Sequence, residues 1–295
     1  MDHPETSTFR RHLPIVLVGL GFILFVVGAL GRNGPDPSQS PMAAVQAIGT
    51  ITIGIGLLWL TISWVMHAAR RTAGGPERPI SVVLFDLDGT LTDPHEGITN
   101  CLRYAMKELG HEPPPAEELR WCIGPPLREN FAHLLDTNDP ALLDKAVALY
   151  RERFGETGMY ENALFSEVEE ALGEIRAGGF RMFIASSKPL VYVKKIVEHF
   201  GLAGYFDGVY GSELNGDRTD KGDLIRHILE AESLNPSETL MVGDREHDVI
   251  GARKCGLRCA AVTYGYGTKE ELDAARPDYV FDSLLEIAEF LEAVR

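Results

Sequence analysis

The chain has 295 residues and a net charge of −15, and its length suits one or two domains. Residues 1–78 carry a net charge of +2 and the rest of the chain −17. A polypeptide with this much negative charge repels the phosphates of nucleic acids. We therefore expect no nucleic-acid partner. The four cysteines show no C-x-x-C spacing, which argues against a zinc site or a disulfide framework.

Two long uncharged segments occupy the beginning of the chain, at residues 13–31 and 42–68. A helix needs about twenty apolar residues to cross a bilayer. We therefore expect residues 1–72 to form a membrane anchor of two transmembrane helices, a hairpin that inserts into the lipid bilayer. A cleaved signal peptide is the alternative for the first segment, but the second long segment, which follows at once, favours the hairpin.

Arginines flank the predicted hairpin on its outer sides. Two precede the first segment and three follow the second, whereas the connecting loop contains only Arg32. By the positive-inside rule, both ends of the hairpin face the cytoplasm. The sequence thus predicts a multi-pass protein of a bacterial inner membrane, with a linker at residues 73–79 and the rest of the chain in the cytoplasm.

The apolar run Val82–Phe85 is typical of a strand buried on both faces of a parallel sheet. Asp86 and Asp88 follow it directly, and Gly89 permits a tight turn. Two adjacent carboxylates oppose each other's ionisation, but phosphoryl transfer has a use for both. One can attack phosphorus, the other can move a proton, and a divalent cation reduces their repulsion. An ordinary Asp-Gly turn is the alternative.

Between residues 96 and 163 the apolar spacing becomes helical. The helices predicted in this region are Ile98–Leu109, Ala116–Cys122, Leu127–Leu135 and Ala141–Phe154. A rigid Gly-Pro-Pro turn precedes Arg128, which is the residue of this region best suited to reach an anionic substrate. A solvated surface arginine is the alternative.

From residue 164 onward, helical and strand patterns alternate. The predicted strands lie near Phe180–Ala185, Gly208–Tyr210, Thr239–Val242, Ala260–Thr263 and Tyr279–Phe281. Capping boxes begin the helices predicted at Ser166–Ala177 and Ser283–Ala293. This alternation predicts an α/β fold, with a doubly wound, mostly parallel, Rossmann-like sheet covered by helices on both faces.

Three further polar clusters follow the predicted strands. They are Ser186-Ser187-Lys188 after the strand at 180–185, Lys221 at the start of a helical stretch, and Asp244 with Asp248 after the strand at 239–242. Ligands of such sheets bind at the carboxyl ends of the strands, so we expect these residues to gather around Asp86. Taken singly, Lys221 and Lys188 are also consistent with solvated lysines, and Asp248 with a helix cap.

The four clusters, in this order, resemble the motifs of the haloacid dehalogenase superfamily of phosphohydrolases. The resemblance covers Ile80 to Arg295. It implies a core domain at residues 80–95 and 164–295, with a helical cap domain inserted at residues 96–163. Within the superfamily the chain looks most like the phosphoglycolate phosphatase group and its 5′-nucleotidase relatives.

The resemblance also implies a role for each matching residue. Asp86 would be the nucleophile and form an aspartyl-phosphate, and Asp88 would be the general acid and base. Lys221 would neutralise the phosphate. The phosphate-binding residues would be Ser186, Ser187 and Lys188, and the Mg²⁺ ligands would be Asp86, the backbone carbonyl of Asp88, Asp244 and Asp248.

We therefore predict a Mg²⁺-dependent phosphomonoesterase that acts on a small phosphorylated metabolite. A dehalogenase is disfavoured because it has no role for Asp88. A phosphosugar mutase of the same superfamily is an alternative, because it also keeps both aspartates. The alternative from another class is a non-enzymatic, membrane-tethered sensor of a phosphorylated ligand, which would need neither Asp86 as nucleophile nor Asp88 as acid.

Overall fold

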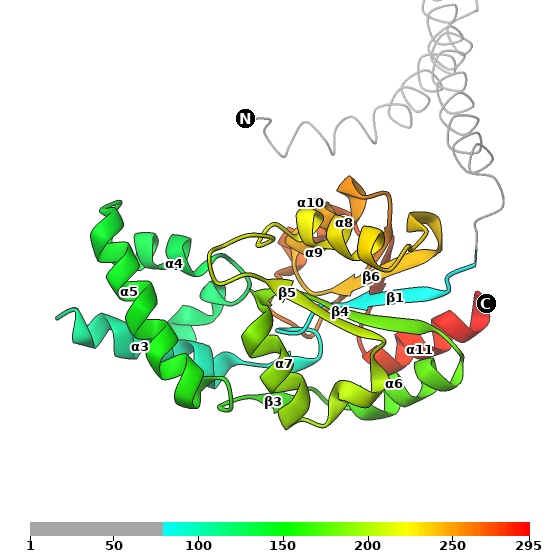
Figure 1. Ribbon diagram of the computed structural model, residues 1–295, viewed down its shortest axis with the longest axis horizontal. Coiled ribbons are helices and arrows are strands. Elements are labelled where there is room, and N and C mark those ends of the chain that lie inside the picture. Colours follow the sequence, from blue (N-terminus) through cyan, green and yellow to red (C-terminus); the bar gives the residue numbers. More distant parts are fainter. Residues whose placement is uncertain (1–78) are drawn as a thin grey trace, which may run out of the picture. The chain divides into compact units, whose positions relative to one another are not determined.

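A computed structural model describes residues 79–295 of the chain. Its centre is a six-stranded parallel sheet with the order β5-β4-β1-β6-β7-β8 (Figure 1). The strands are β1 (Val82–Phe85), β4 (Arg181–Pro189), β5 (Gly208–Ser212), β6 (Thr239–Gly243), β7 (Arg258–Val262) and β8 (Tyr279–Phe281). The predicted α/β fold with a Rossmann-like parallel sheet is confirmed.

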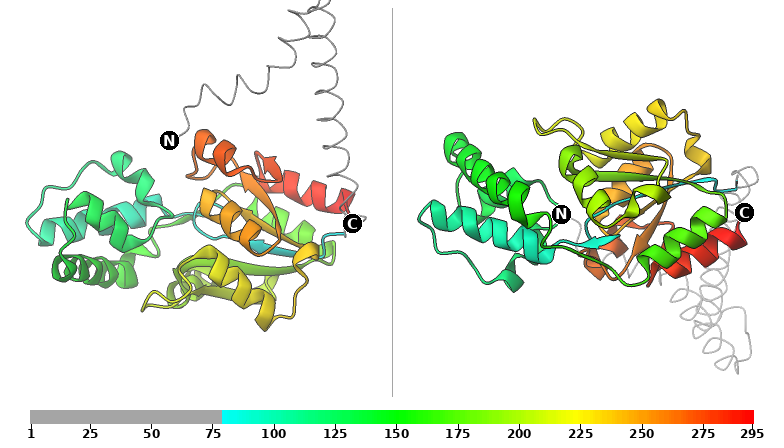
Figure 2. Two further views of the ribbon diagram at one scale, coloured as in Figure 1. Left: turned by 90° about the horizontal axis from the view of Figure 1, so that it is seen from above. Right: turned by 60° about the horizontal axis from the view of Figure 1, so that its bottom comes forward.

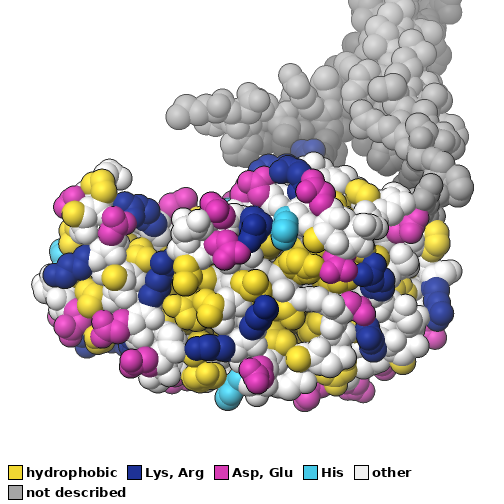
Figure 3. Space-filling view, in the orientation of Figure 1, with side chains coloured by type: hydrophobic (Ala, Val, Ile, Leu, Met, Phe, Trp, Pro, Cys, Tyr) yellow, Lys and Arg dark blue, Asp and Glu magenta, His cyan; other side chains and the backbone are white. Residues whose placement is uncertain are grey.

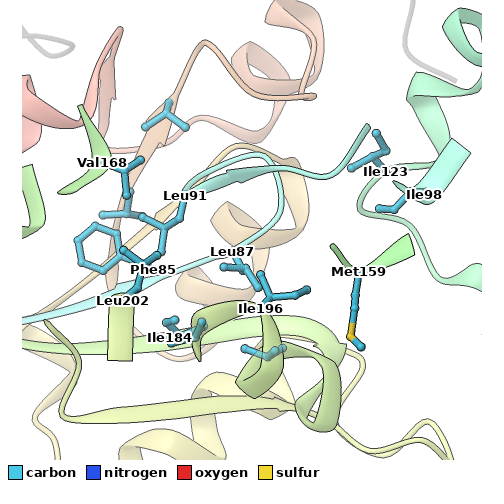
Figure 4. Packing of buried hydrophobic residues seen from close by; sticks show 14 of the residues in the cluster. Phe85, Leu87, Leu91, Ile98, Ile123, Met159, Val168, Ile184, Ile196 and Leu202 are labelled. Carbon is cyan, nitrogen blue, oxygen red and sulfur yellow. The ribbon is translucent and has the colours of Figure 1, made fainter. Parts of the chain in front are cut away.

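Helices cover both faces of this sheet. Side chains alternate along β1, so Val83 and Phe85 face one side and Val82 and Leu84 the other. The first side is covered by α6 (Val168–Ala177), α7 (Leu190–His199) and α11 (Leu284–Ala293), and the second by α8 (Lys221–Ala231) and α9 (Glu246–Lys254), with α10 (Lys269–Ala275) beside α9. Figure 4 shows Phe85 in the core of the first side.

A helical insert, residues 95–158, interrupts the sheet after β1. A short antiparallel pair, β2 (Thr92–Asp93) and β3 (Ala163–Leu164), leads into and out of it. The insert consists of α3 (His95–Glu108), the 3₁₀-helix η1 (Ala116–Cys122), α4 (Leu127–Leu134), α5 (Pro140–Arg153) and the π-helix η2 (Phe154–Gly158). Figure 2 shows it at one end of the molecule, away from the C-terminus.

The four helices predicted in this region are present, although η1 is a 3₁₀-helix. The described residues 79–295 belong to one compact unit by their contacts. The division into a core domain and a cap domain at residues 96–163 stays a prediction.

The two predicted capping boxes have different outcomes. At α6 the prediction is wrong, because the helix begins at Val168 and its cap residue is Glu167, which has a left-handed φ of 66° and makes no capping hydrogen bond. At α11 the Ser283 hydroxyl accepts a hydrogen bond from the backbone N–H of Glu286 at 3.2 Å. The return bond to the Glu286 carboxylate comes from the backbone N–H of Asp282, at 2.8 Å, one residue earlier than a capping box requires.

The predicted membrane anchor over residues 1–72 lies outside the described residues, and so do both predicted spans and nearly all of the linker. Within residues 79–295, no helix combines the length and the apolar character that a bilayer crossing requires. The predicted localisation in a membrane, with a cytoplasmic catalytic domain, is corrected by this finding. The bilayer as an expected partner rests on residues 1–72, outside the described residues, and stays a prediction.

Candidate active site

The carboxyl ends of β1, β4 and β6 and the first turn of α8 meet at one edge of the sheet. Here they border a cavity of about 840 Å³ beneath the helical insert. The predicted site residues that line it are Asp86, Asp88, Arg128, Ser186, Ser187, Lys188, Lys221 and Asp248. Asp244 is fully buried at the end of β6. The chain thus brings together residues that lie up to 162 positions apart in the sequence.

Three carboxylates form the acidic part of the site. Oxygens of Asp86, Asp244 and Asp248 lie within 4.8 Å of one another. Burial raises the pKa of Asp86 to about 6; the Lys221 ammonium lowers it and the Asp248 carboxylate raises it. Burial, together with Asp248 and Asp86, raises the pKa of Asp244 well above its ordinary value. The three groups therefore resist simultaneous ionisation without a further cation.

Lys221 is the cation that contacts this cluster. Its Nζ lies 3.0 Å from Asp86 Oδ1 and 2.8 Å from Asp248 Oδ1, and it donates to the carbonyl of Ala185 at 2.8 Å. Burial by itself would lower the pKa of Lys221, but the carboxylates of Asp248 and Asp86 outweigh burial and raise it. Lys221 thus contacts two of the three carboxylates, and full ionisation of all three would leave two negative charges uncompensated.

This arrangement fits a magnesium ion. Mg²⁺ prefers oxygen ligands, is commonly held by one or two carboxylates, and keeps several waters. Asp248 Oδ1 is buried and accepts no well-directed hydrogen bond from the described residues; its contact with Lys221 is an ion pair. Asp244 is oriented by the hydroxyl of Thr90 at 3.2 Å and by the backbone N–H of Tyr266 at 2.8 Å. A divalent cation would compensate the two remaining charges.

Gly89 allows the turn after β1 to approach this acidic cluster. It has a φ of +86°, which glycine adopts without strain. A Cβ atom at this position would lie 2.2 Å from Asp244 Oδ2. A side chain at residue 89 would therefore displace the buried carboxylate.

Asp88 contacts Lys188 rather than the acidic cluster. Lys188 Nζ lies 2.8 Å from Asp88 Oδ1 and 2.6 Å from Oδ2, and both side chains are largely buried. The same ammonium lies 4.9 Å from the centre of the Phe154 ring, which belongs to the insert. Lys188 was predicted to bind phosphate, whereas its observed partners are a carboxylate and an aromatic ring.

The two predicted serines lie in the last part of β4, where the pairing with β5 shifts register between Ser186 and Pro189. The Ser186 side chain is buried, and its hydroxyl accepts a hydrogen bond from the backbone N–H of Lys188 at 3.3 Å. The carbonyl of Ser187 accepts a hydrogen bond from the hydroxyl of Ser212 at 2.8 Å. Both serines line the cavity, so the carboxyl end of β4 presents polar groups to the cavity that Asp86 also lines.

Arg128 lies at the wall of the cavity, but its guanidinium is already engaged. It forms an ion pair with Asp144 of α5 and donates to the carbonyl of Pro140 at 3.4 Å. Its side chain is 47% exposed, so this pair adds little to stability. These contacts favour the alternative of a surface arginine within the insert.

Sequence reasoning missed the loop that follows β7. Its Tyr266 orients Asp244, and the hydroxyl of Tyr264 donates to the carbonyl of Thr90 at 2.7 Å. Gly265 lies so close that its Cβ would be 2.3 Å from Asp244 Cβ. The available signal was the Tyr-Gly-Tyr-Gly run directly after the predicted strand at 260–263.

Comparison with known proteins agrees with this geometry. A family model described as haloacid dehalogenase-like hydrolase matches residues 83–262. The chain belongs to this family. Its acidic cluster is consistent with the Mg²⁺ that haloacid dehalogenase-like phosphatases generally use.

Three of the relatives carry different names. A 5′-nucleotidase of Pseudomonas aeruginosa is 43% identical over 211 residues, which cover 72% of this chain and 95% of the relative. A phosphoglycolate phosphatase of Vibrio parahaemolyticus is 30% identical over 221 residues, covering 72% and 96%. The tyrosine-protein kinase PtkA of Mycobacterium tuberculosis is 34% identical over 203 residues, covering 69% of each chain.

Among solved structures, a predicted phosphatase from Clostridium acetobutylicum superimposes with a TM-score of 0.69 at 39% identity. The match covers 72% of this chain and 98% of the other. This haloacid dehalogenase-like hydrolase is thus a phosphatase that resembles phosphoglycolate phosphatases and 5′-nucleotidases.

Proposed function

We propose that this phosphatase is a Mg²⁺-dependent phosphomonoesterase that hydrolyses a small phosphorylated metabolite through an aspartyl-phosphate on Asp86. One observation carries the proposal. Oxygens of Asp86, Asp244 and Asp248 lie together beside a cavity that Asp88 also lines, and the buried ammonium of Lys221 contacts Asp86 and Asp248. This arrangement supports the proposal, because the reaction needs a nucleophile, a second carboxyl group and a cation-binding cluster close together.

Each residue then has a defined part in the reaction. Held by Asp86, Asp244, Asp248 and the backbone carbonyl of Asp88, Mg²⁺ would neutralise charge on the phosphate oxygens. The ammonium of Lys221 and the hydroxyl of Ser186 bind the same phosphate group.

In the first step an oxygen of Asp86 attacks phosphorus while the bond to the leaving oxygen breaks, and Asp88 donates a proton to that oxygen. In the second step Asp88 removes a proton from water, which attacks the phosphorus of the aspartyl-phosphate. Inorganic phosphate leaves, and the Asp86 carboxylate is regenerated. Lys188 holds the Asp88 carboxyl group in place through both steps.

The presence of Asp88 in the site favours phosphoryl transfer over a sensor role. A carboxyl group beside the aspartyl-phosphate can activate water, and a sensor has no use for such a group. A phosphosugar mutase also needs both aspartates, but it returns the phosphoryl group to a sugar. Kinase activity is named for the Mycobacterium relative and is not part of this proposal.

The shape of the cavity bears on the substrate. Its volume of about 840 Å³ is large for a two-carbon ester such as phosphoglycolate. Aromatic side chains of Tyr150, Phe154 and Tyr192 line part of the wall. Figure 3 shows hydrophobic side chains exposed between the insert, on the left, and the helices around the sheet. These features favour a nucleoside monophosphate, whose base can stack on an aromatic ring. The insert would act as the cap that excludes water.

The test is phosphate release by the full chain, freed of metal with EDTA and then supplied with Mg²⁺. Substrates are p-nitrophenyl phosphate, nucleoside monophosphates and phosphoglycolate. We expect Mg²⁺-dependent turnover that Asp86→Asn abolishes, while Asp88→Asn slows both formation and hydrolysis of the phosphoenzyme. The control is Asp273→Asn, an exposed aspartate on α10. Turnover unaffected by Asp86→Asn would falsify the assignment, and release of an isomeric phosphate ester would identify a mutase.

A further inference from the structure

Arg245 directly follows the buried Asp244, yet its side chain has no part in the proposed chemistry. Its backbone is extended, with φ −122° and ψ 160°, and its N–H donates to Asp248 Oδ2 at 3.1 Å. The guanidinium leaves the acidic cluster and reaches the helical insert, where Nη1 donates to the carbonyl of Ile123. This contact joins residues 122 positions apart in the sequence.

Glu271 fixes the core end of this contact. Its Oε1 accepts hydrogen bonds from Arg245 Nε at 2.8 Å and from the backbone N–H of Glu246 at 2.9 Å. The Arg245 and Glu271 side chains are only 13% and 15% exposed. A charged pair of this kind, held from two helices, leaves the guanidinium little freedom to rotate.

The part of the insert that contacts Arg245 is also constrained. The turn after Ile123 contains Gly124, Pro125 and Pro126. The buried amide of Asn130 donates to the carbonyl of Cys122 at 2.7 Å, so the insert satisfies that group internally. The carbonyl of Ile123 is satisfied by Arg245 instead.

Gly124 allows the Arg245 guanidinium to approach the turn of the insert. It has a φ of +108°, and a Cβ there would lie 3.0 Å from Arg245 Nη1. Residues 124–128 line the cavity, so their distance from the sheet determines the height of the cavity roof. Figure 4 shows Ile123 close to Ile98, at the side of the site where the insert begins.

We propose that Arg245 is a positioning residue that holds the turn at residues 123–126 over the phosphate site. The proposal rests on the proposed function, because the turn that Arg245 holds would contact the leaving group of the substrate. It adds a direct mechanical link between the strand end that carries Asp244 and the insert. Arginine is required, because a lysine has one nitrogen and cannot donate to Glu271 and to the Ile123 carbonyl in the same planar geometry.

The test uses the full chain and three variants. Arg245→Lys keeps the positive charge but removes the planar guanidinium with its several N–H donors. Glu271→Gln keeps Arg245 but replaces its ion pair with a weaker, neutral hydrogen bond. The matched control is Arg253→Lys. Arg253 likewise donates two hydrogen bonds, but its acceptors are the backbone carbonyls of Ala275 and Arg276, which lie away from the insert. The first readout is amide hydrogen exchange without substrate. The second is kcat and KM for a nucleoside monophosphate, and the third is the Mg²⁺ concentration that gives half-maximal rate.

We expect Arg245→Lys and Glu271→Gln to speed amide exchange at residues 122–128 and to raise KM about tenfold, as loss of a charge-assisted hydrogen bond predicts. We expect kcat to fall less and the Mg²⁺ requirement to stay constant. Wild-type exchange in both variants, or the same change in Arg253→Lys, would overturn the proposal. If the wild-type chain hydrolyses no phosphate ester, the proposed function fails, but the exchange measurement still decides the role of Arg245.

Discussion

Lys221 Nζ lies between two carboxylates, 3.0 Å from Asp86 and 2.8 Å from Asp248. Its side chain is 3% exposed, so removal of the ammonium leaves buried carboxylates without their cation. We expect Lys221→Met to lower the free energy of unfolding of the metal-free protein by about 3 kcal/mol. Urea unfolding at pH 7 in EDTA measures this change.

The same variant should lower kcat about 100-fold or more, because the phosphate loses a fixed positive charge in the transition state. Lys269→Met is the control, since Lys269 and its partner Asp273 are 83% and 69% exposed, and we expect no measurable change in either quantity. Equal effects of the two substitutions would contradict the role of Lys221.

The pKa of Asp86 predicts a pH-dependent stability. Burial raises this pKa to about 6 in the folded protein, against 3.8 for an ordinary aspartate. The folded state therefore binds the extra proton between pH 4 and pH 6. The contribution of Asp86 to the free energy of unfolding is fully present below pH 4 and falls by about 3 kcal/mol as the pH rises through 6.

Asp86→Asn should remove this loss, because an amide does not titrate. The measurement is urea unfolding of the metal-free wild type and variant between pH 4 and pH 7. The stability of the variant relative to the wild type should rise across this interval. Parallel profiles would show that burial does not perturb Asp86.

Gly89 offers a test of the metal site that requires no change to a ligand. Gly89→Ala adds a Cβ 2.2 Å from Asp244 Oδ2, at a backbone φ of +86°. Gly110→Ala is the matched control, because Gly110 has a φ of +81° with no atom within 4 Å of its Cβ position. Both substitutions should cost about 1–2 kcal/mol for the left-handed backbone.

Gly89→Ala alone should also raise the Mg²⁺ concentration for half-maximal rate, by about tenfold or more, because Asp244 must move. Titration of activity with Mg²⁺ measures this difference. The same Mg²⁺ requirement in both variants would argue that Asp244 is not a ligand.

The Lys188–Asp88 pair predicts a dependence on the leaving group. Lys188→Met leaves the side-chain stem but removes the ammonium that lies 2.6 Å from Asp88 Oδ2. Protonation matters more for an alkoxide than for p-nitrophenolate, which is a stable anion. We therefore expect kcat/KM to fall by about tenfold more for a nucleoside monophosphate than for p-nitrophenyl phosphate.

Lys194→Met, an exposed lysine of α7, is the control for this comparison. A uniform loss over both substrates would indicate that Lys188 acts on the phosphate group itself, as its predicted role requires, and not on Asp88.

Local patterns were enough to predict much of the sheet and its polar edge. The strand at 82–85 and the aspartates after it are neighbours in sequence, so their relationship is visible in one short segment. The gathering of Ser186, Lys221 and Asp248 at one edge follows from the rule that parallel strands end together. These relationships depend on periodicity and order alone.

Relationships between distant side chains were not predicted. The pairing of Lys188 with Asp88 and the reach of Arg245 to Ile123 depend on side-chain rotamers and on the position of the insert. The ion pair of Arg128 with Asp144 was not predicted for the same reason, because Asp144 belongs to another helix of the insert. The spacing of residues in the sequence predicts the helix or strand to which a residue belongs, but it does not predict which side chain of another element the residue contacts.

The paired strands β2 and β3 hold the two ends of the insert side by side, which affects how the insert can evolve. Thr92 lies opposite Leu164 and Asp93 opposite Ala163, so the chain leaves and re-enters the parent fold at adjacent points. Apart from the residues that contact the core, such as Ile123 and Phe154, the sequence between these points can change while the ends remain in register. With the proposed role of the insert as a cap over the substrate, selection can exchange one substrate preference for another and leave the phosphate-handling residues of the core unchanged.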